Sequence, residues 1–356
     1  MSPRARPGSP LALLVVAALA VPALALAEAT PDLLRYFTAE EIAEREAFSF
    51  PLRMNWLVSQ LLNVAATVAF LGFGLNRRLR LASEGWAARL ASKVPAEGPL
   101  ARIGAALSRL WGDGTWSGAL LFGFAYFAIL QLMALPQSFY FDWVYQRAHG
   151  LSVEPFGRWL KDMVKGQLTG VLAFSFLVFG LYGLVRKLKR WPLVLGIPCA
   201  VLLLGAGILD PYRTRFYFDY VPMPKGEAEE KIRAVLAKAG VEYEGVYVLK
   251  MHDVSRRVNA SLEGEGPTRR IVVWDTTLAT LTPDEVANAV AHEVGHLNDR
   301  GIGKPVMAGL AVIPLLLGLS WFLRRLGRSG RFGFDGERDV AGLPAAMFFI
   351  WLLITV

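Results

Sequence analysis

Long apolar runs dominate the pattern of hydrophobic and polar positions along this chain. A helix needs about 20 predominantly apolar residues to cross a bilayer. Runs approaching that length occupy residues 56–75, 116–136, 167–185, 193–209 and 305–323, and another begins near Val340. We therefore predict a mainly α protein, a polytopic membrane helical bundle of about 6–7 spans.

The N-terminal segment has two readings. Two arginines precede an apolar run that ends in ALALA before Glu28, and its small alanines suit a signal-peptide cleavage site. The same run could remain as a first span. Residues 1–29 are therefore either a signal peptide or a first span, and an N-terminal membrane domain with helical spans covers residues 30–209.

The pattern changes in residues 210–304, where charges of both signs are mixed with short apolar stretches. Residues 225–240 have helical spacing and stop at Gly240, whereas 246–250 and 270–275 are rich in β-branched and aromatic residues and predict strands. Glycines and a proline at 264–267 suit a hairpin turn. We expect a small water-facing α+β domain here, followed by C-terminal spans in residues 305–356.

Composition agrees with a membrane protein. Residues AVILMFWYC make up 54% of the chain and charged residues only 19%, against about 45–50% apolar in soluble domains. The net charge of +8 comes from basic clusters at the ends of apolar runs, as in RRLR (77–80), RKLKR (186–190) and RRLGR (324–328). Cytoplasmic flanks of spans collect such residues, so we predict no nucleic-acid partner.

The stretch AHEVGHLNDRG, residues 291–301, carries the candidate chemistry. A T-x-x-E capping box at 282–285 predicts the start of its helix, and Gly301 its end. Residues four apart share a helix face, so His292 and His296 can aim at one cation. Glu293 can then take a proton from a water that zinc has activated, which is the mechanical content of H-E-x-x-H. The competing interpretation is a pair of surface histidines.

A catalytic zinc site needs a third protein ligand. Downstream of the helix, Glu337 and Asp339 flank a span, and we interpret them as charges at a membrane boundary. Upstream, His252 and Asp275 are further candidates. The residues alone do not decide between them.

Five stretches together resemble the membrane-embedded zinc metalloproteases typified by the type I CAAX prenyl endopeptidase. They are QRAHGLSVEPFGRWLKDMVKG, FDYVPMPKGEAEEKI, DVSRRVNASLEG, RRIVVWDTTLATLTPDEVANAV and AVAHEVGHLNDR. The resemblance implies a seven-helix membrane fold that encloses a chamber, closed by a gluzincin-like zinc-metalloprotease domain. It also implies one Zn²⁺ per chain.

The resemblance assigns roles to particular residues. It implies that His292 and His296 are zinc ligands, that Glu293 is the catalytic base, and that Asn259 and Ala260 hold the substrate backbone by strand addition. Ser261 departs from the aromatic residue that often follows N-A in the family, which puts substrate preference in doubt. His149, in the HGLS loop, is interpreted as structural.

The family's third ligand is a glutamate in an E-x-x-x-D helix beyond the last span, and the sequence given stops at Val356 before any such segment. We expect either a chain cut short before that ligand or an inactive relative.

Two functions from different classes follow. The first is a zinc-dependent membrane endopeptidase that cleaves membrane-associated or CAAX-type prenylated substrates, or serves quality control of membrane proteins where prenylation is absent. Its partners are a peptide or protein substrate, with or without a lipid, and membrane lipids. The alternative is a catalytically inactive member that acts as a membrane binding or scaffold protein. A transporter is disfavoured because the spans contain almost no charges.

Lysine and arginine counts predict the orientation in a multi-pass integral membrane protein. Residues 76–115 contain seven, 186–192 four and 324–338 five, whereas the alternate segments 28–55 and 137–166 are poorer or balanced by acids. The positive-inside rule places the basic loops in the cytoplasm and the zinc domain on the extracytoplasmic side. Eukaryotic family members work in the opposite sense, with the zinc domain towards the cytosol.

Overall fold

The computed structural model describes residues 37–94, 97–111, 116–201, 212, 219–299 and 303–355, and the chain divides into two compact units. The first unit, here called the bundle unit, comprises residues 1–141, 164–189 and 318–356. The second, called the sheet unit, comprises residues 142–163 and 190–317. Each unit is described by itself.

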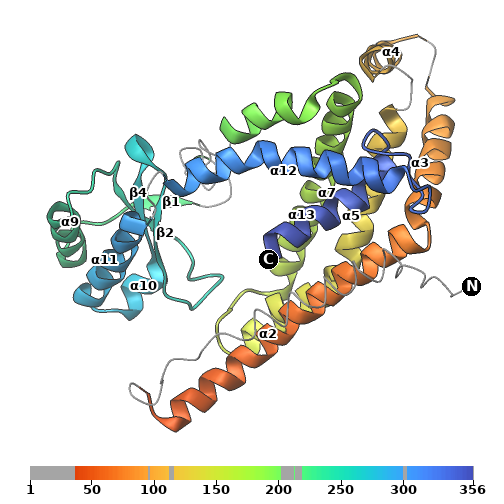
Figure 1. Cartoon of the computed structure of the whole chain (residues 1–356). Helices are drawn as coiled ribbons and strands as arrows, with labels where there is room; N and C mark the ends of the chain where they lie inside the picture. Colours follow the sequence, from red (N-terminus) through yellow and green to blue (C-terminus); the bar gives the residue numbers. More distant parts are fainter. Residues whose placement is uncertain are drawn as a thin grey trace, which may run out of the picture. The chain divides into compact units, whose positions relative to one another are not determined.

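Helices dominate the chain (Figure 1). In order they are α2 (Ala39–Thr67), α3 (Leu75–Ala91), α4 (Pro99–Trp111), α5 (Trp116–Ser138), α6 (Gln146–Ala148), α7 (Phe156–Lys187), α9 (Glu227–Lys238), α10 (Asp275–Thr280), α11 (Pro283–Asp299), α12 (Gly303–Gly327) and α13 (Leu343–Thr355). Two π-helical segments, η2 (Val68–Gly72) and η3 (Phe139–Tyr145), prolong α2 and α5. The short 3₁₀ turns are η4 (Gly266–Thr268) and η5 (Val340–Gly342).

Within the described residues, four helices are long and apolar enough to cross a membrane: Ala39–Gly72, Trp116–Ala148, Phe156–Lys187 and Val306–Gly327. They contain the apolar runs predicted near 56–75, 116–136 and 167–185, and most of 305–323. Two shorter apolar helices, Trp191–Val201 and Val340–Leu353, match the start of the 193–209 run and the run at Val340. Residues 202–209 and the candidate signal segment 1–29 lie outside the described residues.

The structure differs from the predicted loops. The polar segment 28–55 was expected to precede the first span, but α2 begins at Ala39. A capping box starts it, in which the Thr38 amide donates to Glu41 Oε2 at 2.8 Å and the Glu41 amide donates to Thr38 Oγ1 at 3.2 Å. Helices α3 and α4 likewise fill most of 76–115, and η3 and α6 fill part of 137–166. Hydropathy finds the apolar middle of a helix, whereas the helix itself continues into polar sequence as long as its backbone hydrogen bonds are made.

Aromatic packing joins the helices of the bundle unit. Phe70 of η2 meets Tyr126 of α5 edge to face at 4.9 Å between ring centroids, and Tyr182 of α7 and Leu343 of α13 belong to the same buried cluster. Polar pairs add specific links between helices, such as Trp351 Nε1 to Gln60 Oε1 at 2.6 Å. These contacts fix α2, α5, α7 and α13 as one bundle.

The sheet unit contains a four-stranded sheet in the order β1-β2-β4-β3. Its strands are β1 (Tyr220–Pro222), β2 (Val246–Leu249), β3 (Ala260–Glu263) and β4 (Arg270–Trp274). Strands β2 and β4 are parallel and the other two pairs are antiparallel. The predicted helix at 225–240, both predicted strands and the hairpin turn before Arg270 are confirmed.

Helices α9 and α11 cover one face of this sheet (Figure 1). Their shared core contains Ile232 and Leu236 from α9, Val286 and Val290 from α11, and alternate residues of β2, β3 and β4. On the other face, the buried Arg270 donates to Glu263 Oε2 at 2.7 Å, and its guanidinium lies 4.3 Å from the Tyr220 ring centroid. Contacts on both faces of the sheet thus fix the register of the β3–β4 hairpin. Strand β3 lies at the edge of the sheet.

Candidate metal centre

Helix α11 is positioned by its first turn and by its apolar face. The Thr282 amide donates to Glu285 Oε2 at 2.8 Å, and the Glu285 amide donates back to Thr282 Oγ1 at 3.4 Å, so the predicted capping box is present. The hydrogen bond from the Thr282 backbone holds the pKa of Glu285 below its usual value. Gly301, the predicted stop, lies outside the described residues, and the helix ends at Asp299.

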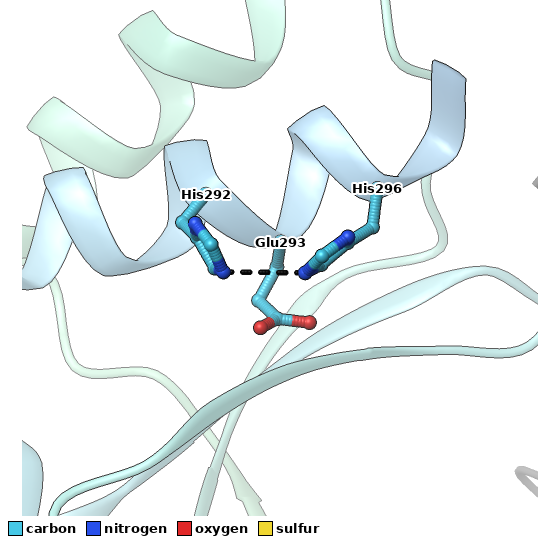
Figure 2. A group of neighbouring side chains, drawn as sticks. All are labelled: His292, Glu293 and His296. Carbon is cyan, nitrogen blue, oxygen red and sulfur yellow. Dashed lines mark hydrogen bonds between the residues drawn. The ribbon is translucent and has the colours of Figure 1, made fainter. Parts of the chain in front are cut away.

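The two histidines converge. Nε2 of His292 lies 3.2 Å from Nε2 of His296, and Figure 2 shows the rings turned towards each other across one helical turn. Two nitrogens that each lie about 2.0–2.1 Å from one tetrahedral zinc ion are about 3.3 Å apart. The side chains therefore already hold the separation that a shared zinc ion requires, and the residues fit this metal.

Glu293 lies on the same side of the helix as the histidine rings (Figure 2). One ligand atom from each of His292, Glu293 and His296 lies within 4.8 Å of the others. Glu293 is half-buried, whereas the two histidines are exposed. Beside them, apart from the adjoining residues and backbone of α11 itself, nothing lies within 4 Å of where a Cβ on Gly295 would be, so the helix leaves open space at this point.

The other candidate ligands do not join this group. Among the described residues, His292, Glu293 and His296 form the one cluster of histidine, cysteine and acidic side chains close enough to share an ion. His252 and Asp275 bind each other instead, with Nδ1 2.5 Å from Oδ2. In the bundle unit, Glu337 accepts a hydrogen bond from Ser320, and Asp339 pairs with Arg80 at 2.6 Å.

The His252–Asp275 pair secures the loop that leads into β3. Oδ1 of Asp275 accepts the amides of Met251 at 2.8 Å and His252 at 3.1 Å. The hydrogen bond to Asp275 raises the pKa of the His252 imidazole. Burial raises the pKa of the Asp275 carboxyl, but the hydrogen bonds from His252 and the Met251 amide outweigh it, so that pKa lies below its usual value.

Asn259 and Ala260 lie where β3 begins, beside α11. The Asn259 carbonyl accepts from the Trp274 amide at 3.0 Å, and the Asn259 amide donates to Thr277 Oγ1 at 2.7 Å. The main chain of Asn259 is therefore bound towards the interior of the sheet, while its side chain is exposed. The side chain of Ala260 is buried in the core beneath α11.

Sequence reasoning missed the residues that hold this strand. Thr277 Oγ1 also donates to the Asn259 carbonyl at 2.8 Å, and Thr276 Oγ1 donates to the Arg257 carbonyl at 2.6 Å. A strap from the HGLS loop adds further bonds, with the Val153 amide donating to Val254 and the Arg256 amide to Leu151, both at 3.1 Å. No local pattern marks these roles, because each partner is distant in sequence.

His149 has the structural role assigned to it. Its Nδ1 lies 2.9 Å from the Tyr145 carbonyl oxygen, and its ring packs on Tyr145 with 4.1 Å between centroids. These contacts hold the C-terminal end of α6, which precedes the strap.

Two family models match the chain. The model described as peptidase family M48 matches residues 222–355, and the model described as CAAX prenyl protease N-terminal, five membrane helices, matches residues 22–213, more than half of the chain. The first therefore covers the sheet, the H-E-x-x-H helix and the last apolar helices.

Curated relatives share this pattern at low identity. The uncharacterized metalloprotease YhfN of Bacillus subtilis is 31% identical over 65% of this chain and 55% of its own length. The CAAX prenyl protease 1 homolog of Oryza sativa is 25% identical over 60% of this chain and 51% of its own length. The chain thus spans about half the length of the curated relatives it matches.

A solved structure shows the same fold. The crystal structure of S. mikatae Ste24p superposes with a TM-score of 0.72 at 17% identity, covering 98% of this chain and 83% of that one. The predicted class, a membrane helical bundle with a small α+β domain, is confirmed by this likeness.

Proposed function

This chain belongs to peptidase family M48, and on that premise we propose that it is a zinc-dependent endopeptidase of the membrane. The observation that carries the proposal is the convergence of His292 and His296, with Nε2 atoms 3.2 Å apart. The carboxylate of Glu293 stands beside them, within 4.8 Å.

Each residue of the group has a distinct task in this proposal. His292 and His296 would hold one zinc ion, which supplies a water molecule activated for attack on a peptide carbonyl. Glu293 takes the proton from the attacking water and passes it to the leaving amine, as a general base and then a general acid. Its half-buried position keeps the carboxylate aimed at this space while leaving it accessible to the substrate.

Strand β3 is the proposed substrate-binding strand, and the substrate would pair with its open edge. In an antiparallel pair the amide and carbonyl of one residue point to the same side, and successive residues alternate. Since the main chain of Asn259 is bound inward, that of Ala260 points to the open edge. We infer that Ala260 binds the substrate through its backbone and Asn259 through its exposed side-chain amide.

The proposed substrates are membrane-associated proteins, including CAAX-type prenylated ones. Two observations support this class. The chain has several helices able to cross a membrane, and several of its relatives are named CAAX prenyl proteases. On this proposal the peptidase domain covers residues 210–304.

A second function is favoured by one observation. The cluster of possible ligands in the described residues holds two histidines and the proposed base, and no third ligand. A family member without a complete metal site would act as a membrane binding or scaffold protein. The two proposals differ in whether the full-length protein binds zinc stoichiometrically.

The decisive experiment combines metal content with cleavage. Purified full-length wild-type protein should contain one zinc per chain and cleave a membrane-anchored peptide. E293Q should retain the zinc and lose about 10²–10⁴-fold in turnover, because the base is removed and both ligands remain. H292A should lose the metal itself.

Gln131→Ala in the bundle unit, which alters a polar pair between α5 and α7, serves as a control for general damage. Cleavage by E293Q at the wild-type rate would contradict the role of Glu293. Wild-type protein that folds but carries no zinc and cuts nothing would favour the scaffold function.

We also propose that the zinc domain, residues 210–304, faces the extracytoplasmic side. The support is the excess of lysine and arginine in residues 76–115, 186–192 and 324–338.

A further inference from the structure

A cavity of about 390 Å³ in the bundle unit is lined by arginines from four separate elements. These are Arg80 of α3, Arg186 of α7, Arg324 of α12, and Arg328 and Arg338 of the segment between α12 and α13. Gly118 and Ala119 of α5 line it with small residues. The arginines thus line one space from several elements instead of being spread along a single helix.

Four acidic residues line this cavity beside its five arginines, which leaves a net formal charge of +1. Asp339 accepts hydrogen bonds from Arg80 at 2.6 Å and from the amides of Asp335 and Ala341 at 3.1 and 2.9 Å. Glu84 lies 3.9 Å from Arg80 and Glu337 lies 3.9 Å from Arg324, while Asp335 is exposed. The Arg328 side chain makes no hydrogen bond or ion pair with the described part of the chain.

The cavity wall is held in place. The buried Asn76 side chain donates to the carbonyls of Phe332 at 2.7 Å and Ala341 at 2.9 Å, which pins both ends of the segment that carries Arg338. Because the backbone of this segment is fixed at two points, the part of the wall that carries Arg338 is pre-organised before any ligand arrives, and less ordering entropy is lost there on binding.

A second cavity, of about 470 Å³, continues from the first along the end of α12. Arg324 and Arg328 line both cavities, and the second adds Arg325 and Trp321. The Trp321 side chain is 64% exposed, at the boundary between the apolar part of the span and its basic end. Tryptophan at such a boundary packs against lipid at the headgroup level.

We propose that the two cavities form a binding site for the phosphate headgroup of an anionic phospholipid. Arginine binds phosphate through paired N–H groups, and basic pockets between transmembrane helices accept anionic headgroups. A lipid satisfies both halves of the site, because its phosphate meets Arg324 and Arg328 while its glycerol and acyl chains pass Trp321. Free phosphate would contact only the arginines and not Trp321.

The test measures lipid retention by the full chain. Wild-type protein in nanodiscs of equal phosphatidylglycerol and phosphatidylcholine is transferred to detergent, and the bound lipid is counted by native mass spectrometry. We expect phosphatidylglycerol to be retained preferentially. R324Q/R328Q should weaken that retention about tenfold, whereas the control R78Q/R102Q, which removes two exposed arginines elsewhere in the bundle unit, should leave it unchanged.

Three outcomes would overturn the proposal. They are equal retention of the two lipids by the wild type, equal loss in R324Q/R328Q and the control, and displacement of the lipid by millimolar inorganic phosphate, which would identify a free-anion site. The lipid competition on the wild type depends on no variant, so the proposal stays testable even if R324Q/R328Q fails to fold.

Discussion

At the scale of single residues, Thr277 shows that the proposed site depends on side chains that have no catalytic or metal-binding role. Its hydroxyl accepts from the Asn259 amide and donates to the Asn259 carbonyl, at 2.7 and 2.8 Å. One side chain therefore satisfies both polar groups of the residue that precedes the proposed substrate-binding edge. The side chain is buried, so water cannot replace it.

The variant T277V should loosen the start of β3. Removing the hydroxyl takes away the partner of the Asn259 amide in a part-buried contact, at a cost of about 1 kcal/mol in unfolding free energy. We expect KM for a peptide substrate to rise more than kcat falls, because Glu293 is untouched. T277S, which restores the hydroxyl, should recover both parameters, and an equal loss in T277S would show that the volume of Thr277 matters instead.

The H-E-x-x-H group was predictable and Thr277 was not, for a physical reason. The relative positions of His292 and His296 follow from helix geometry alone, and the local sequence is enough to predict that helix. Thr277 and Asn259 meet because β3 and β4 pair in one particular register. The same limit explains why β1 was not predicted: a three-residue strand has no pattern of its own and depends on β2.

At the scale of elements, the loop before β3 is joined to α10 by a titratable contact. His252 Nδ1 and Asp275 Oδ2 are 2.5 Å apart, and Asp275 also binds two loop amides. The protonated imidazole is the form that this contact favours. The order of the loop is therefore coupled to pH.

The pH dependence has a definite sign. Because the pKa of His252 is raised in the folded protein, its contribution to stability is fully present below about pH 6.5 and is lost as the pH rises through the folded pKa. The thermal midpoint of the wild type should therefore exceed that of H252Q most at pH 6 and least at pH 8.5. A constant difference across this range would contradict the assignment, and D275N should lose the same dependence.

At the scale of the whole molecule, hydropathy identified the apolar middle of the helices and missed their ends. Helix α2 extends to Ala39 and α5 continues into η3 and α6, because capping and backbone bonding continue where apolar side chains stop. Neither unit depends on a disulfide, since Cys199 is the only cysteine. The proposed orientation of the chain in the membrane is argued from the lysines and arginines that flank its apolar runs.

That orientation can be measured with single cysteines in a C199A background. We expect K238C, on the exposed side of α9, to react with a membrane-impermeant maleimide in intact cells. S92C, at the end of α3, should react only after permeabilisation, because the positive-inside rule places that end in the cytoplasm. The reverse pattern would place the zinc domain, residues 210–304, in the cytoplasm.

If Ala260 binds the substrate as proposed, the position of β3 at the edge of the sheet limits which polypeptides can be cut. Pairing with Ala260 requires a polypeptide whose own amides and carbonyls are unoccupied over several residues. A segment within a helix, or one already paired in a sheet, has no unoccupied amides and carbonyls for this pairing. Cleavage would therefore require local unfolding of the substrate around the cleavage site. The turnover rate would then depend on how often each substrate unfolds there.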